Sequence, residues 1–227
     1  MTIVLALRGA AAVALLLTLV GGVPRLVQAG LAVGVGLWAA AVAGATAVPG
    51  ATAVPVAESA LWLIAVRELV IGATIGVVAA VPLLAVATAG RIVARASGLP
   101  GDARAGGPYG ALFTVLAAAV FVGIDGHVAV VEAIAQSFGA VPAVPTIEPR
   151  VIAALGGLLP AAVRLAVPWL ITAAVVEIAA GVAMRVAGRA AAHTPLAAAT
   201  PAALVMITAS LIGTLAVAIA ALVRSAL

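Results

Sequence analysis

The feature that most constrains this chain of 227 residues is a succession of apolar runs, several of them long enough to cross a bilayer. A transmembrane helix needs about 20 mainly apolar residues. Short connections rich in Gly, Pro and polar residues separate the runs, as expected between helices. Because 66% of the residues are hydrophobic and only 8% are charged, one soluble core could not hide the apolar surface. The sequence therefore predicts an all-α, polytopic integral membrane protein.

About six hydrophobic segments are expected, within a single membrane domain of residues 1–227. They cover residues 9–20, 26–48, 60–89, 109–138, 151–184 and 201–223. The third and fifth are longer than a straight span requires, so we expect them to tilt, to extend beyond the hydrocarbon, or to bend, with Pro82 and Pro168 as the candidate bends. The fourth is interrupted at Asp125, Gly126 and His127, which indicates a helical hairpin or a kinked helix.

The connections between the segments are predicted to be loops. The most polar of them covers residues 90–109 and contains Arg91 and Arg95 among glycines and prolines. Arg185 and Arg189 lie in the connection before the last segment, and a simple six-span topology places both connections on the same side. Because arginine-rich loops favour the cytoplasm, this side is expected to be cytoplasmic.

The charged residues exclude several classes of function. All eleven basic residues are arginine, and the net charge of +4 comes from side chains scattered between apolar runs. Nucleic-acid binding requires clustered Lys and Arg on a solvated face, so nucleic acid is not an expected partner. The absence of cysteine excludes disulfides, thiolate catalysis and sulfur-ligated metals.

Asp125, His127 and Glu132 form the one cluster whose residue types suit catalysis or metal binding. On a continuous helix, Asp125 and His127 would lie about 200° apart, so one metal ion could not contact both from one face. A turn at Gly126 would bring them together, but a zinc site needs further ligands and the chain has no HExxH motif. We therefore expect these residues to cap and satisfy a helical turn, and we expect no enzymatic activity, metal or cofactor.

Charged residues inside apolar segments are candidates for function, because a charge in lipid is costly. They are Glu68, Arg164 and Glu177. Glu68 follows Arg67 directly, and the two charges are interpreted as lying at the membrane interface. Arg164 and Glu177 either pair with neighbouring helices or subunits, or face a water-filled path, and pairing between helices is the interpretation that we favour.

Two pairs of glycines spaced four residues apart, Gly30 with Gly34 and Gly72 with Gly76, are predicted to allow close helix packing. The spacing alone has low specificity in a chain rich in Ala and Gly.

Several short motifs follow one another along residues 8–142. Gly126-His127 is followed about ten residues later by Ser137-Phe138 and then by Pro142. The motifs upstream are Arg8, Pro24-Arg25, Glu68 with Gly72 and Gly76, Ala89-Gly90, and Gly98-Leu99. In this order they resemble the FliR/SctT family of flagellar and injectisome export apparatus proteins. Two features of that family have no counterpart here: an aromatic residue shortly after Gly98-Leu99, and the C-terminal aPqlN signature.

The resemblance implies a non-enzymatic membrane subunit without cofactors, in the inner membrane of a bacterium. It implies assembly with FliP/SctR-like and FliQ/SctS-like subunits into a channel for unfolded export substrates, and an FlhB/SctU-like subunit as a further partner. It also implies that one loop lies nearest to the export path and contributes to the plug, namely Gly98, Leu99, Pro100, Gly101 and Asp102.

Two other functions stay open at this point. Arg164 and Glu177 in apolar segments would also suit a small-solute transporter or permease. An intramembrane enzyme built on Asp125, His127 and Glu132 is the least favoured hypothesis.

Overall fold

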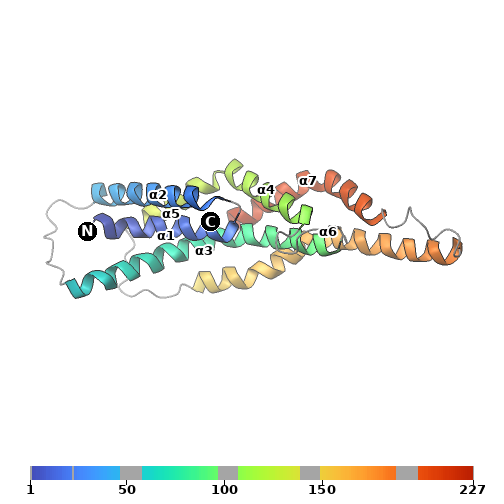
Figure 1. Ribbon diagram of the computed structural model, residues 1–227, viewed down its shortest axis with the longest axis horizontal. Coiled ribbons are helices and arrows are strands. Elements are labelled where there is room, and N and C mark those ends of the chain that lie inside the picture. The colour runs from blue at the N-terminus through green and yellow to red at the C-terminus, as the bar shows by residue number, and fades with distance from the viewer. Residues whose placement is uncertain are drawn as a thin grey trace. The chain divides into compact units, whose positions relative to one another are not determined.

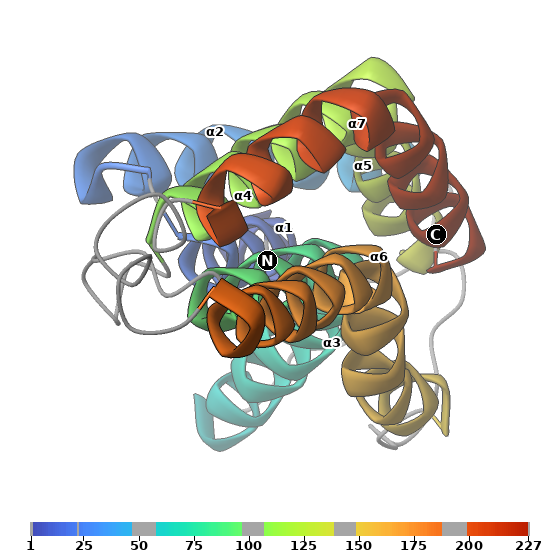
Figure 2. The same ribbon diagram turned by 90° about the vertical axis from the view of Figure 1, so that its right-hand side faces the viewer.

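The computed structural model describes residues 2–21, 23–46, 58–96, 107–138, 149–187 and 199–226. Every regular element in these ranges is an α-helix, as Figures 1 and 2 show, which confirms the all-α prediction. The helices are α1 (Thr2–Val20), α2 (Arg25–Thr46), α3 (Glu58–Ala96), α4 (Gly107–Gly123), α5 (Gly126–Ser137), α6 (Pro149–Ala187) and α7 (Ala199–Ala226).

The described helices have the length and composition of a multi-pass membrane protein. Four of them, α2, α3, α6 and α7, are long and apolar enough to cross a bilayer, and the bent pair α4 and α5 makes a fifth candidate span. The apolar helix α1 is shorter. With the bent pair counted as one, these are the six hydrophobic segments that the sequence predicts.

The chain folds into two compact units. The first consists of Met1–Pro82, Val122–Gly156 and Val223–Leu227, and the second of Leu83–Phe121 and Gly157–Leu222. The boundaries between them fall inside helices, so α3, α4, α6 and α7 each contribute residues to both units. The single membrane domain therefore stays a prediction.

Helix α3 corrects one predicted boundary, because it continues to Ala96 where the sequence suggested a loop from residue 90. Gly90, Arg91 and Arg95 are all helical. Arg91 and Arg95 made this part of the sequence look like a polar loop. The opposite face of the helix is nevertheless apolar and continues through Val93, whose side chain is fully buried. Arg95 lies in the last turn of the helix, where a positive charge interacts favourably with the helix dipole.

A glycine and a glutamine define the turn between α1 and α2 in the first unit. Gly21 has a φ of 73°, and its N–H donates to the carbonyl of Leu17 at 3.0 Å, which is the left-handed ending common in helices. The amide of Gln28 donates to the carbonyl of Val23 at 3.1 Å and to that of Leu17 at 3.4 Å. The Gln28 side chain of α2 therefore links its own helix to the last turn of α1 and to the connection after it.

Helices α4 and α5 meet at an angle of 63°, which confirms the predicted kink or hairpin in the fourth segment. Asp125 lies at the break and has a φ of 59°, in the left-handed region. Its carbonyl accepts hydrogen bonds from Val128 and Ala129 at 2.9 and 3.2 Å and so begins α5. The Asp125 side chain makes no capping hydrogen bond, so the expectation that it caps the turn is wrong, and its backbone carbonyl begins α5 instead.

Small residues bring α1 close to its neighbours in the first unit. A Cβ at Gly36 would lie 2.6 Å from the carbonyl oxygen of Ala6, and one at Gly76 would overlap the carbonyl of Ala12. The expectation of close packing is therefore correct for the glycine pair of α3. For Gly30 and Gly34, which are exposed, no described residue lies within 4 Å of an added Cβ, so close packing at that pair stays a prediction. Spacing alone does not say which face of a helix meets a neighbour, and on α2 that face contains Gly36.

Candidate functional site

Arg8 is the centre of a buried polar cluster in the first unit. The sequence placed this residue ahead of the first apolar segment, but α1 begins earlier and Arg8 lies inside it, with only 2% of its surface exposed. Because a buried guanidinium that lacks partners is strongly destabilising, its environment must supply acceptors and a negative charge.

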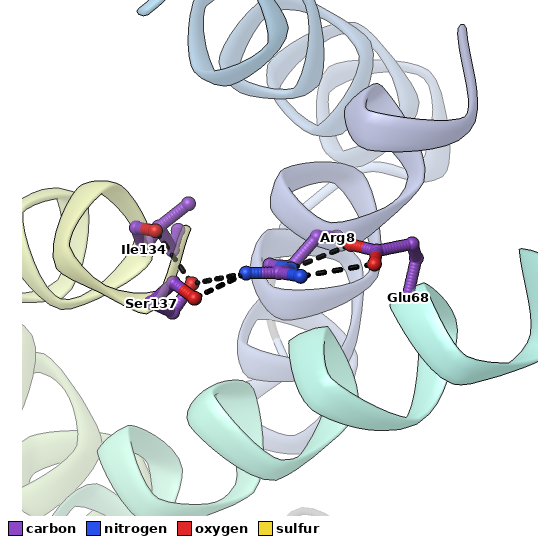
Figure 3. Close-up of polar contacts among 4 residues, drawn as sticks. All are labelled: Arg8, Glu68, Ile134 and Ser137. Carbon is purple, nitrogen blue, oxygen red and sulfur yellow. Dashed lines mark hydrogen bonds and ion pairs between the residues drawn. The ribbon is translucent and has the colours of Figure 1, made fainter. Parts of the chain in front are cut away.

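Glu68 of α3 supplies the negative charge, as Figure 3 shows. The Nε and Nη2 atoms of Arg8 donate to the two carboxylate oxygens of Glu68 at 2.6 and 2.9 Å. This paired geometry matches the planar fork of the guanidinium to the carboxylate. The two side chains are 2% and 5% exposed, so water screens the ion pair little.

The spacing between Glu68 and Gly72 has a physical explanation in this contact. Residues four apart lie on the same face of a helix, so both of them face α1. Glu68 binds the side chain of Arg8, and a Cβ at Gly72 would overlap the backbone carbonyl of that same arginine. The glycine therefore permits the close approach of α3 to α1 that brings the carboxylate within reach.

The end of α5 completes the cluster. The Nη1 atom of Arg8 donates to the backbone carbonyl and to the hydroxyl of Ser137 at 2.5 and 3.1 Å. The Ser137 hydroxyl in turn donates to the carbonyl of Ile134 at 2.6 Å (Figure 3). The guanidinium carbon lies 4.4 Å from the ring centroid of Phe138, in the range of a cation–π interaction. One arginine therefore joins α1, α3 and the end of α5.

The chemistry of this cluster is structural. The hydrogen bonds satisfy buried donors and acceptors, and they specify how three helices meet.

In the second unit, Gly90 allows a close approach between two helices, as Gly72 does in the first unit. A Cβ at Gly90 would lie 2.7 Å from the carbonyl oxygen of Tyr109 and 2.8 Å from the Cβ of Phe113, so α3 and α4 meet there in close contact. The Ala89-Gly90 motif of the sequence thus marks the crossing of these two helices.

Trp169 joins three helices of the second unit and was not singled out from the sequence. Its ring makes an edge-to-face contact with Phe113 of α4 at 5.2 Å between centroids. Its Nε1–H donates to the hydroxyl of Thr208 of α7 at 2.8 Å, and that hydroxyl donates to the Leu204 carbonyl at 2.6 Å. The signal in the sequence was a lone tryptophan after Pro168, which by itself names no partner.

The two embedded charges of α6 are both exposed. Arg164 and Glu177 lie 13 positions apart, which at 100° per residue turns their side chains to directions about 140° apart. No described residue pairs with either of them through a hydrogen bond or an ion pair.

The remaining candidates do not gather into a site. Gly126 is buried at the start of α5, whereas Asp125, His127 and Glu132 are exposed, and Glu132 accepts a hydrogen bond from the amide of Gln136. Among the residues that the structure describes, no three His, Cys, Asp or Glu side chains could hold a metal ion together.

Six of the predicted residues lie outside the described ranges. They are Gly98, Leu99, Pro100, Gly101, Asp102 and Pro142.

The model of the family described as "Bacterial export proteins, family 1" matches residues 1–226 of the chain. A comparison with curated proteins gives no match. Because the family match covers essentially the whole chain, this multi-pass membrane protein belongs to the bacterial export proteins of family 1, the FliR/SctT family of export-apparatus proteins.

Proposed function

We propose that the chain is a non-enzymatic subunit of a type III protein export gate, flagellar or injectisome, in the bacterial inner membrane. In this proposal it assembles with FliP/SctR-like and FliQ/SctS-like subunits, next to an FlhB/SctU-like subunit, and forms part of a channel for unfolded export substrates. The segment of Gly98, Leu99, Pro100, Gly101 and Asp102 would lie nearest to the export path.

The observation that carries the proposal is the convergence of four motif residues on one contact. Arg8 lies 60 positions from Glu68 and 129 positions from Ser137, yet its guanidinium binds both and lies over the ring of Phe138. These are the positions on which the sequence resembles the export family. Because they converge on one contact, these motif residues together hold α1, α3 and α5 in place.

The exposed apolar surface of the first unit supports a role within an assembly. Leu26 and Leu37 of α2 are 88% and 61% exposed, and Trp62 of α3 is 60% exposed. In a membrane protein such side chains are covered either by lipid or by other subunits. The proposal assigns part of this surface to partner subunits.

The permease alternative depended on Arg164 and Glu177. Because both side chains are exposed and point about 140° apart around α6, they do not form one binding site within the second unit. No observation on the described residues favours this alternative.

The test is co-expression of the affinity-tagged chain with the FliP/SctR-like and FliQ/SctS-like proteins of the same organism. We expect all three to be recovered as one complex, and we expect the complex to restore secretion of an unfolded substrate in a strain that lacks this subunit. Glu68→Leu should abolish both. Glu132→Gln, an exposed change on α5, is the matched control and should preserve both. Recovery of an isolated chain that transports solutes in proteoliposomes without partners would overturn the proposal.

A further inference from the structure

Helix α1 is enclosed by neighbouring helices of the first unit. Among its side chains at positions 6–20, only Thr18 and Leu19 are exposed. The helix is rich in alanine, and its backbone comes close to Gly36 of α2 and Gly76 of α3. Most of its surface is therefore held against protein, and little of it can face lipid.

The same helix is short for one that crosses a bilayer. Its apolar part, Ala6–Val20, is about 22 Å long at 1.5 Å per residue, whereas the hydrocarbon is about 30 Å thick. Arg8 lies inside this part, and an arginine within an apolar segment is costly. On its own, α1 therefore lacks both the length and the composition of a stable span.

The chain supplies no counter-charge for Arg8 before α3. Residues 1–57 contain Arg8 and Arg25 and no acidic residue. Glu58, at the start of α3, is the first acid, and the carboxylate that binds Arg8 is that of Glu68. Helix α3 therefore brings α1 both the charge that it lacks and the close backbone contact at Gly72.

We infer that α1 is a conditional membrane helix, which stays in the bilayer only when Glu68 of α3 neutralises Arg8. It enters the membrane together with α3, whereas α2 is long and apolar enough to span without help. The inference goes beyond the proposed function and does not depend on it, because every contact that it uses lies within this chain.

An asymmetry between the two charged residues distinguishes this role from packing alone. Either Arg8→Leu or Glu68→Leu breaks the ion pair and leaves one buried charge without compensation, so a purely structural role affects both variants alike. For membrane insertion the two changes are opposite. Arg8→Leu removes the charge from α1, which should stay in the bilayer, whereas Glu68→Leu leaves that charge without a partner, so α1 should leave.

An introduced cysteine measures where α1 lies, because the chain has none of its own. Leu15→Cys places a thiol on α1, and a membrane-impermeant maleimide is applied to both faces of the membrane in vesicles and spheroplasts. The thiolate is the reactive form, and an apolar environment suppresses it, so a thiol in lipid or in the protein interior is protected.

We expect Leu15→Cys to be protected in the otherwise unaltered chain and together with Arg8→Leu. Together with Glu68→Leu, labelling should rise on the order of tenfold, because the thiol then reaches water. Adding Arg8→Leu to Glu68→Leu should restore protection, which shows that the variant with Leu at position 68 is able to hold α1 in the membrane.

Two controls accompany this experiment. Val33→Cys, at a position 57% exposed on the span of α2, should stay protected in every background. Glu132→Gln removes an acid outside the cluster and should leave Leu15→Cys protected. Protection of Leu15→Cys with Glu68→Leu, or equal labelling with Glu68→Leu and Arg8→Leu, would overturn the inference.

Discussion

The carboxylate of Glu68 accepts two hydrogen bonds from the guanidinium of Arg8, in an interior where both side chains are almost completely buried. Neither charge could remain there alone, because removing either partner leaves an ion without compensation. The stability of the first unit should therefore depend on the two residues together.

Removal of one partner of this pair is expected to be far more harmful than removal of both. Glu68→Leu should lower the free energy of unfolding by about 3–5 kcal/mol, because Arg8 then stays buried without its counter-charge. The double variant Arg8→Met with Glu68→Met should recover much of this loss. Denaturation of the purified protein in detergent measures both values, and a double variant less stable than either single one would contradict the explanation.

A methyl group at Gly72 should separate α3 from α1. Because a Cβ there would overlap the carbonyl of Arg8, Gly72→Ala is expected to cost about 1–3 kcal/mol of stability. Gly34→Ala is the matched control, since an added Cβ meets nothing within 4 Å, and it should be neutral or raise stability by up to about 1 kcal/mol. Equal effects of the two substitutions in detergent denaturation would refute the role of Gly72.

The break between α4 and α5 depends on the backbone conformation of Asp125. Since its φ of 59° is unfavourable for a β-branched residue, Asp125→Val should cost about 1–3 kcal/mol, and Asp125→Gly should keep or raise stability. Glu132→Val introduces the same side chain at an exposed helical position and should cost less. Thermal unfolding of the three variants compares them directly, and a destabilised glycine variant would argue against the backbone explanation.

Of the tryptophans in the described helices, Trp169 is expected to stabilise the folded protein the most. Trp169→Ala removes the contact with Phe113 and the hydrogen bond to Thr208, and it should cost about 3–5 kcal/mol. Trp62→Ala, at a position 60% exposed, should change stability by no more than about 0.5 kcal/mol in detergent. Denaturation followed by circular dichroism distinguishes the two, and a mild effect at position 169 would mean that the cluster is dispensable.

Local patterns in the sequence were sufficient for the helices and for the break at Asp125. Hydropathy depends on each residue and its near neighbours, so apolar segments and their interruptions can be predicted without a structure. The end of α3 was predicted too early, because Arg91 and Arg95 resembled a polar connection while Val93 continued the buried face. A charge on one side of a helix does not end it when the other side is packed.

The sequence by itself determined that this chain is an all-α membrane protein with motifs of the export family. Only the tertiary structure decided that Arg8, Glu68, Ser137 and Phe138 belong to one contact, and that Gly72, unlike Gly34, packs against a described helix. The physical reason is that the ion pair and the close approach join residues distant in the chain. Such contacts form only when the buried faces of several helices pack together, and the sequence of a single helix does not specify which faces will meet.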